Sequence, residues 1–217
     1  MRRRRPKAAT TRATPRAARA RHALATDYLV VGLGNPGGEF ERTRHNSGAD
    51  TVQLLAHRYG GKLKRDRAKA LVGKVRISGL EVVLAFPQTY YNDSGLAVAT
   101  LARRLHLDDN IDHVVIVHDE LDLEPGRVKV KSGGGLAGNN GLRSIVAHLH
   151  SDEFARVRIG VGKPPGRQEG ADHVLRRPGK AERGNLDVAI ADAADAVELI
   201  VTDGIGTAMT RYNQLPD

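Results

Sequence analysis

The chain has 217 residues, of which 27% are charged and 40% hydrophobic, with a net charge of +9 and no cysteine; its mean hydropathy is −0.39. These values exclude fibrous, collagen-like and wholly disordered classes. The sequence also lacks the ~18 apolar residues of a membrane-spanning helix, the apolar segment of a secretory signal and any thiol, so we expect a cytoplasmic protein without disulfides or cysteine metal sites.

The charge is concentrated at the N-terminus. Residues 1–26 hold nine of the 34 basic residues and none of the 25 acidic residues, so residues 27–217 carry 25 of each. The tail is rich in Ala, Arg and Thr and has too little apolar surface to offset the entropy of ordering it, so we expect a disordered basic extension. Three explanations of this extension remain open: it is an RNA-binding arm, an organelle transit peptide, or the product of a wrongly assigned start codon.

The body begins with a β-prone run. Residues 28–33 predict a buried strand, and the Gly, Asn and Pro residues of 34–38 predict a loop after it. Apolar residues at helical spacing then predict a helix over residues 46–59, which Gly60 and Gly61 end.

A hairpin is expected next, because residues 71–77 and 81–86 alternate like two strands that meet at Ser78-Gly79. The run 113–117 is the richest in β-branched residues and predicts a central strand. The remaining predicted elements are strands at 127–131 and 155–161 and helices at about 94–106, 141–149, 182–202 and 204–214.

Helices and strands alternate through residues 27–217 with no linker and no internal repeat. We therefore expect one α/β domain in which a twisted mixed β-sheet is surrounded by helices.

Two glycine patterns in this domain suggest nucleotide sites. Residues 32–37 fit G-x-G-x-x-G after a strand, but Pro36 followed by glycines would break the helix that a dinucleotide site needs. Residues 133–139 resemble a P-loop, but Asn139 stands where the phosphate-binding lysine is needed.

Residues 118–122, His-Asp-Glu-Leu-Asp, follow the strongest predicted strand, and their carboxylates and imidazole suggest a metal site. The alternative is a solvated loop whose acids cap turns. Because alternate side chains diverge along such a segment, one inward acid is favoured over four ligands.

His45 is the favoured catalytic histidine. Asn35, Asn46, Asn92 and Asn140 all lie at junctions between loops and helices, and carboxamides can bind peptide groups or an oxyanion without titrating. Each Asn alone is compatible with a helix cap or turn, and His45 alone with an exposed helix start. Together with one Asp, the set suggests hydrolysis by activated water.

The order of seven motifs resembles the bacterial-type peptidyl-tRNA hydrolase family over residues 28–212. The motifs are VVGLGNPG at 30–37, TRHNSG at 43–48, PQTYYNDSG at 87–95, HDELD at 118–122, GGG at 133–135, NGL at 140–142 and RVRIG at 156–160. The resemblance implies that residues 27–217 are a catalytic domain with that family's fold. It implies an esterase that frees tRNA from peptides dropped by the ribosome, without metal or cofactor.

By matching positions, the resemblance implies that His45 is the general base and that Asp119 orients the imidazole and stabilises its cation. The implied substrate-binding residues are Asn35, Phe40, Tyr91, Asn92 and Asn140. Lys131 and Arg158 would bind the tRNA 5′-phosphate, as suits charged donors.

Other basic residues are expected to contact tRNA phosphates without reading sequence. They are Arg44, Lys129, Arg143, Arg156 and Lys163, beside Lys131 and Arg158. Asn side chains that pair with the first peptide group would favour peptidyl-tRNA over aminoacyl-tRNA. We expect tRNA as the partner, no membrane binding and a monomer.

Three residues depart from the family pattern. Phe40 stands where tyrosine is usual, Tyr91 where methionine is common, and Asn139 where histidine is frequent. Two other functions remain open. One is an RNA-binding relative of this fold that no longer turns over substrate, and the other is a nucleotide-dependent enzyme built on the glycine pattern.

Overall fold

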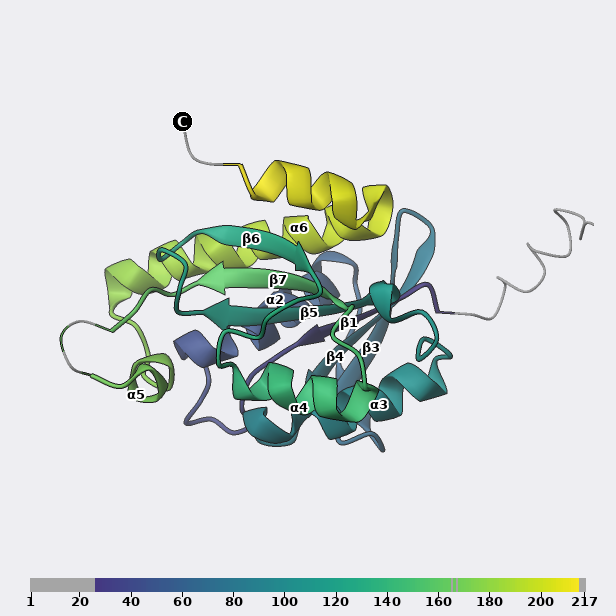
Figure 1. The fold of residues 1–217 in the computed structure, drawn as a ribbon, viewed down its shortest axis with the longest axis horizontal. Coiled ribbons are helices and arrows are strands. Elements are labelled where there is room, and N and C mark those ends of the chain that lie inside the picture. The colour runs from purple at the N-terminus through teal and green to yellow at the C-terminus, as the bar shows by residue number, and fades with distance from the viewer. Residues whose placement is uncertain (1–25, 165, 167, 215–217) are drawn as a thin grey trace, which may run out of the picture.

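The computed structural model describes residues 26–164, 166 and 168–214, so residues 1–25 of the expected disordered extension lie outside it. The described residues form one twisted sheet of seven strands in the order β2-β3-β4-β1-β5-β7-β6 (Figure 1). The strands are β1 (Tyr28–Gly32), β2 (Lys64–Asp66), β3 (Ala70–Ile77), β4 (Leu80–Pro87), β5 (Val114–Glu120), β6 (Val128–Ser132) and β7 (Ala155–Gly160).

The sheet is mixed, as predicted. Strands β4, β1, β5 and β7 run parallel to one another, whereas β2, β3 and β6 pair antiparallel with their neighbours. The carboxyl ends of the four parallel strands therefore meet at one edge of the sheet, where open α/β sheets commonly carry their sites. The predicted hairpin is also confirmed. Ser78 and Gly79 join β3 to β4 with φ of 49° and 88°, as a tight two-residue turn requires.

Helices cover both faces of the sheet (Figure 1). One face carries α2 (Ser47–Arg58) and α6 (Lys180–Tyr212), and the other carries α3 (Ser94–Arg104) and α4 (Asn140–Leu149). A short helix, α5 (Gly170–Val174), lies beyond the carboxyl ends of the parallel strands. Three 3-10 helices complete the described elements: η1 (Arg44–Asn46), η2 (Tyr91–Asp93) and η3 (Ile111–His113).

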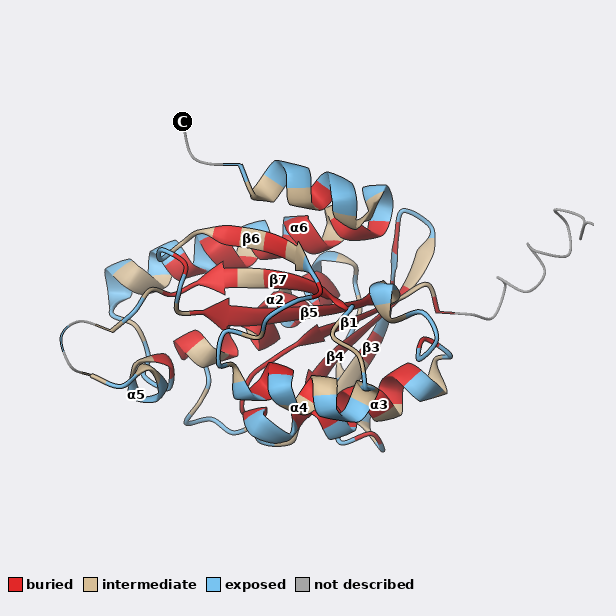
Figure 2. Ribbon diagram, viewed as in Figure 1, coloured by how far each residue is buried: buried red, intermediate tan, exposed pale blue. Residues whose placement is uncertain are grey.

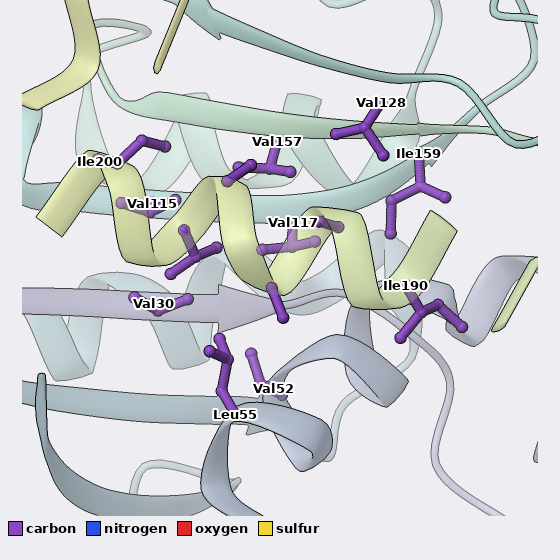
Figure 3. Packing of buried hydrophobic residues seen from close by; sticks show 14 of the residues in the cluster. Val30, Val52, Leu55, Val115, Val117, Val128, Val157, Ile159, Ile190 and Ile200 are labelled. Atoms are coloured by element: carbon purple, nitrogen blue, oxygen red, sulfur yellow. The ribbon is translucent and has the colours of Figure 1, made fainter. Parts of the chain in front are cut away.

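The core lies on both sides of the central strands, which are buried along most of their length (Figure 2). Alternate residues of one strand serve the two sides: Val30 belongs to the cluster under α2 and α6, and Leu29 and Val31 belong to the cluster under α3 and α4. Figure 3 shows α6 lying across Val115, Val117 and Val157 on the first of these sides.

Two glycines let α2 approach the sheet. A Cβ on Gly32 would lie 2.0 Å from the carbonyl oxygen of Gly48, and one on Gly48 would lie 2.2 Å from that of Val117. The Leu33 amide donates to the Val117 carbonyl, and the Ala49 amide donates to the Leu33 carbonyl, so this contact is hydrogen-bonded as well as close. It brings η1, which directly precedes α2, against the end of β5.

Other elements differ from the sequence predictions. Strand β5 continues to Glu120, so residues 118–120 belong to the strand and not to a loop after it. Strand β2 and helix α5 were not predicted. Strand β2 consists of three charged residues, and α5 begins at the end of the Pro- and Gly-rich run 162–170. The two predicted C-terminal helices are confirmed, with α6 interrupted at Gly204 (φ 85°). No helix in the described part of the chain has the length and apolar character to cross a lipid bilayer.

Candidate active site

A cavity of about 470 Å³ lies beyond the carboxyl ends of β1, β4 and β5. Its wall includes every residue that the family resemblance assigns to catalysis or substrate binding, drawn from four separate segments of the chain. These residues are Asn35, Phe40, His45, Tyr91, Asn92, Asp119 and Asn140. Segments up to 105 positions apart in the sequence are therefore gathered around one space, which is the geometry that the predicted site requires.

His45 and Asp119 form a hydrogen-bonded pair. The Nδ1 atom of His45 lies 2.9 and 3.0 Å from the two carboxylate oxygens of Asp119. Because a carboxylate only accepts, the proton of the neutral imidazole lies on Nδ1, which leaves the lone pair of Nε2 for a water molecule. Nε2 has no hydrogen-bond partner among the described residues, and 16% of the His45 side chain is exposed. The pair can therefore accept a proton from solvent in the cavity.

Asp119 is almost fully buried at the end of β5. Burial alone would raise the pKa of its carboxyl group, but the charge and hydrogen bond of His45 and the charge of His118 outweigh burial and hold the pKa below its ordinary value. Asp119 is therefore ionised at neutral pH, and its negative charge can stabilise a protonated His45.

Tyr91 covers this pair from η2. Its ring stacks on the His45 imidazole with centroids 3.6 Å apart, and its hydroxyl donates to Asp119 Oδ1 at 3.2 Å. The Tyr91 oxygen in turn accepts from Asn139 Nδ2 at 3.0 Å. Burial and, to a smaller extent, the charge of Asp119 raise the pKa of Tyr91 well above its ordinary value, so the hydroxyl keeps its proton.

The four Asn residues have different surroundings. Asn46 is a framework residue, because its carboxamide pairs with the backbone N–H and C=O of Asn35, both at 2.9 Å. The Asn35 side-chain oxygen accepts from the Tyr91 amide at 2.8 Å, and its NH2 group has no partner among the described residues. Asn92 and Asn140 are exposed on the cavity wall, and the side-chain oxygen of Asn140 accepts from Arg143. The NH2 groups of Asn35, Asn92 and Asn140 can therefore donate to a ligand.

The acidic residues of 118–122 each have a separate partner. Asp119 binds His45, Glu120 binds Arg158 with N–O distances of 3.1 Å, and Asp122 pairs with Lys163 at 2.8 Å. Successive side chains of β5 point to opposite faces of the sheet, which separates Asp119 from Glu120. Both Asp119 and Glu120 line the cavity, so two acids reach the site where one was predicted, and each of them is bound to its own basic partner.

The predicted phosphate ligands lie on strands β6 and β7, beside the cavity and not in its wall. Lys131 and Arg158 are on adjacent antiparallel strands and on the same sheet face, because Lys129 lies opposite Arg158 and Lys131 is two residues further. Lys131 has no ion-pair partner among the described residues. Arg158 is held by Glu120, whose side chain lines the cavity, so the two basic residues adjoin the site through this carboxylate.

Two of the basic residues predicted to contact tRNA are internal, which corrects that prediction. Arg44 is 8% exposed; its guanidinium binds both carboxylate oxygens of Glu182 in α6 and the carbonyls of His173 and Arg176. Arg156 is 2% exposed and donates to the carbonyls of the glycine loop 133–135. Both therefore stabilise the fold, since the guanidinium of Arg44 and the two terminal NH2 groups of Arg156 are already bound to groups of the protein.

The glycine patterns are explained by the same contacts. A P-loop directs backbone N–H groups inward, whereas the 133–135 loop directs carbonyls toward Arg156 and would repel a phosphate. After β1, no helix begins at the glycine run; the chain turns at Gly37 (φ 112°) and the next regular helix starts at Ser47. The structure thus supports neither nucleotide site.

Part of the cavity wall was not predicted. Helix α5 and the residue after it contribute Gly170, Ala171, Val174 and Leu175, and the segment before α4 contributes Ala137 and Gly138. None of these residues has a chemically distinctive side chain, so the sequence offered no signal for them. Tyr90 and Glu120, which also line the cavity, adjoin predicted residues and were within reach of the motif analysis.

A family model described as peptidyl-tRNA hydrolase matches residues 29–217. The chain belongs to the peptidyl-tRNA hydrolase family. It is 44% identical over 201 residues to the peptidyl-tRNA hydrolase of Cutibacterium acnes, covering 88% of this chain and all of that protein. It is 47% identical over 193 residues to that of Kineococcus radiotolerans, covering 86% of this chain and 96% of the relative. The crystal structure of peptidyl-tRNA hydrolase from Acinetobacter baumannii superposes with a TM-score of 0.80 at 39% identity, covering 88% of this chain and 97% of that one.

Two of the three residues that depart from the peptidyl-tRNA hydrolase pattern are in contact. Tyr91 and Asn139 are hydrogen-bonded, and Asn139 also caps α4 by accepting from the Leu142 amide at 3.0 Å. The sequence marked Asn139 only as a departure from a frequent histidine; the structure gives it a position beside the His45–Asp119 pair. The third, Phe40, lines the cavity without a hydroxyl.

Proposed function

We propose that this chain hydrolyses the ester bond between a peptide and the terminal ribose of tRNA, releasing the peptide and free tRNA. Family membership supports this carboxylic ester hydrolase activity. The observation that carries the assignment to this cavity is the hydrogen-bonded His45–Asp119 pair. Nε2 of His45 has no partner among the described residues, and the carboxamides of Asn35, Asn92 and Asn140 line the same cavity. An ester is more reactive than an amide, so one water molecule activated by one base suffices without a covalent intermediate.

The reaction follows from these positions. Nε2 of His45 takes a proton from water as the water oxygen bonds to the ester carbonyl carbon, and Asp119 stabilises the resulting imidazolium. Carboxamide N–H donors of Asn35, Asn92 or Asn140 hold the negative oxygen of the tetrahedral intermediate. When the intermediate collapses, the bond to the ribose oxygen breaks and that oxygen takes the proton back from Nε2. The products are a peptide carboxylic acid and tRNA with a free ribose hydroxyl.

Substrate selection comes from two regions. The donors and acceptors of the Asn side chains pair with the first peptide group, which a free aminoacyl-tRNA lacks. Lys131 and Arg158 bind the 5′-phosphate of the tRNA and hold the acceptor end over the cavity. We infer that the protein works as a cytoplasmic monomer on peptidyl-tRNA of any sequence, because phosphate contacts carry no sequence information.

The decisive experiment is the release of N-acetyl-amino acid from N-acetyl-aminoacyl-tRNA, followed with and without EDTA. Equal release in both conditions supports hydrolysis by His45 and water. Release that stops in EDTA contradicts the mechanism. If tRNA binds but no product appears in either condition, the chain is an RNA-binding relative without turnover.

Asp119→Asn is expected to lower kcat by about 10²- to 10⁴-fold. A carboxamide in this position can donate to Nδ1 of His45, which would place the imidazole proton on Nε2 and remove the lone pair that activates water. The measurement is single-turnover hydrolysis of N-acetyl-aminoacyl-tRNA. Asp122→Asn, at an exposed carboxylate three positions away, serves as control and should retain the rate. A rate within a factor of three of the wild type in Asp119→Asn would refute the role of Asp119.

Lys131→Ala is expected to weaken tRNA binding roughly tenfold, because a charged hydrogen bond to phosphate is lost. The slope of log Kd against log salt should fall in magnitude by about one, and kcat should change little. Lys74→Ala is the matched control, since Lys74 is exposed on β3 toward the opposite edge of the sheet. Fluorescence anisotropy with labelled tRNA at several salt concentrations measures both quantities. An unchanged salt slope in Lys131→Ala would remove this residue from the phosphate site.

A further inference from the structure

We propose that the Tyr91 hydroxyl is a positioning group that sets the proton affinity of the catalytic pair by donating a hydrogen bond to Asp119. The proposal deepens the function above and rests on it. It concerns this chain in particular, because Tyr91 is one of the three departures noted above and was predicted only to bind substrate. Here its hydroxyl donates to the carboxylate that holds the base.

The direction of each hydrogen bond is fixed by chemistry. A carboxamide nitrogen only donates and a carboxylate only accepts, so the Tyr91 oxygen accepts from Asn139 and its proton goes to Asp119. His45 Nδ1 donates to the same carboxylate, and both donors reach Oδ1. Asn139 therefore donates to Tyr91, and Tyr91 donates to the same Asp119 oxygen that accepts from His45.

The competition between the two donors gives the hydroxyl its effect. A neutral donor on Asp119 takes part of the negative charge that would otherwise attract a proton on His45. Asp119 and the Tyr91 hydroxyl are both buried, so water screens this interaction little. The hydroxyl therefore weakens the attraction of the Asp119 carboxylate for a proton on the His45 imidazole.

Other charged groups around the pair have their own partners. Arg44 in η1 is bound to Glu182, and Glu120 in β5 is bound to Arg158 of β7. His118 directs its Nδ1 to the Asp119 backbone carbonyl at 2.7 Å. Helices α4 and α5 present no titratable side chain to the cavity. The Tyr91 hydroxyl is therefore the one side-chain donor besides His45 that reaches the Asp119 carboxylate among the described residues.

Tyr91→Phe tests the proposal, because it removes the hydroxyl and keeps the ring stacked on His45. We expect the acid limb of the kcat/KM profile against pH to move up by roughly 0.5 to 1 unit. Hydrolysis relative to the wild type should be about three- to tenfold lower on the acid side than on the alkaline plateau. Asn139→Ser should shift the profile in the same direction by less, since serine still caps α4 but is too short to reach Tyr91.

Tyr28→Phe is the matched control. Tyr28 also stacks on a histidine, His113, with centroids 4.7 Å apart, but it lies outside the cavity. Its profile should superpose on that of the wild type. A Tyr91→Phe profile that superposes on the wild type, or that falls equally at every pH, overturns the proposal, as either shows that the hydroxyl does not act through charge on Asp119.

An NMR titration of the His45 ring signals separates this proposal from the proposed function, because it needs no turnover. The midpoint should be higher in Tyr91→Phe than in the wild type by the same 0.5 to 1 unit. A shifted midpoint in a protein that does not hydrolyse peptidyl-tRNA would contradict the proposed function but support the role of Tyr91. An unshifted midpoint in an active enzyme would contradict the role of Tyr91 but leave the proposed function in place. Thermal melting of each variant confirms that it is folded.

Discussion

His45→Ala should lose about 10³-fold or more of the hydrolysis rate while binding tRNA as tightly as the wild type. Among the described residues that line the cavity, the imidazole is the one group whose free nitrogen can accept a proton from water, and its Nδ1 is already held by Asp119. Alanine leaves water without a base, but it removes none of the basic residues proposed to bind phosphate. The effect should therefore fall on kcat, with Kd for tRNA within about twofold.

Single-turnover release from N-acetyl-aminoacyl-tRNA and anisotropy with deacylated tRNA measure the two quantities separately. His57→Ala is the matched control, since His57 is exposed on α2, twelve positions away and outside the cavity. His45→Ala with more than a tenth of the wild-type rate would mean that another group acts as base. A large loss of tRNA affinity would show that binding and chemistry are not separated as proposed.

Arg44→Ala is expected to lower the free energy of unfolding by about 2 to 3 kcal/mol. It strands two carbonyl groups and the Glu182 carboxylate that Arg44 now binds. The figure lies below the usual range for a buried ion pair because 39% of the Glu182 side chain is exposed and water can solvate part of its charge. Urea unfolding measures the difference, which should appear as a lower midpoint at unchanged slope.

Arg42→Ala is the control for this substitution. Arg42 lies two residues away and also pairs with an acid of α6, Asp187, but 61% of its side chain is exposed. It should change the free energy of unfolding by less than about 0.5 kcal/mol. If Arg44→Ala changes stability as little as Arg42→Ala, the buried pair is not what fastens η1 to α6.

Much of the fold could be predicted from local patterns. The hairpin at Ser78-Gly79 and the apolar period of α2 depend on neighbouring residues, so the sequence alone indicated them correctly. Strand β2 could not be found this way, because Lys64, Arg65 and Asp66 have no strand preference and are ordered by pairing with β3. Helix α5 adjoins a Pro- and Gly-rich run for which the pattern indicates only a loop.

The candidate site was predictable where chemistry is carried by a distinctive residue in a motif. His45 and Asp119 were predicted together and lie within hydrogen-bond distance. The exposure of basic residues was harder to predict, because the sequence does not show whether an arginine faces solvent or the interior. Arg44 and Arg156 were therefore assigned to phosphate, although tertiary contacts bury both of them. Tyr91 lines the cavity with the other residues predicted for the site, but its bond to Asp119 depends on a distance that no sequence pattern encodes.

The anchoring of Arg44 also bears on how this protein is made. Its partners at His173, Arg176 and Glu182 lie 129, 132 and 138 positions further along the chain. Until residues 173–182 have emerged from the ribosome, the segment that holds His45 lacks these anchors. The order in which the chain is translated therefore places the last contacts of the segment that holds His45 late in synthesis, after most of the sheet has been made.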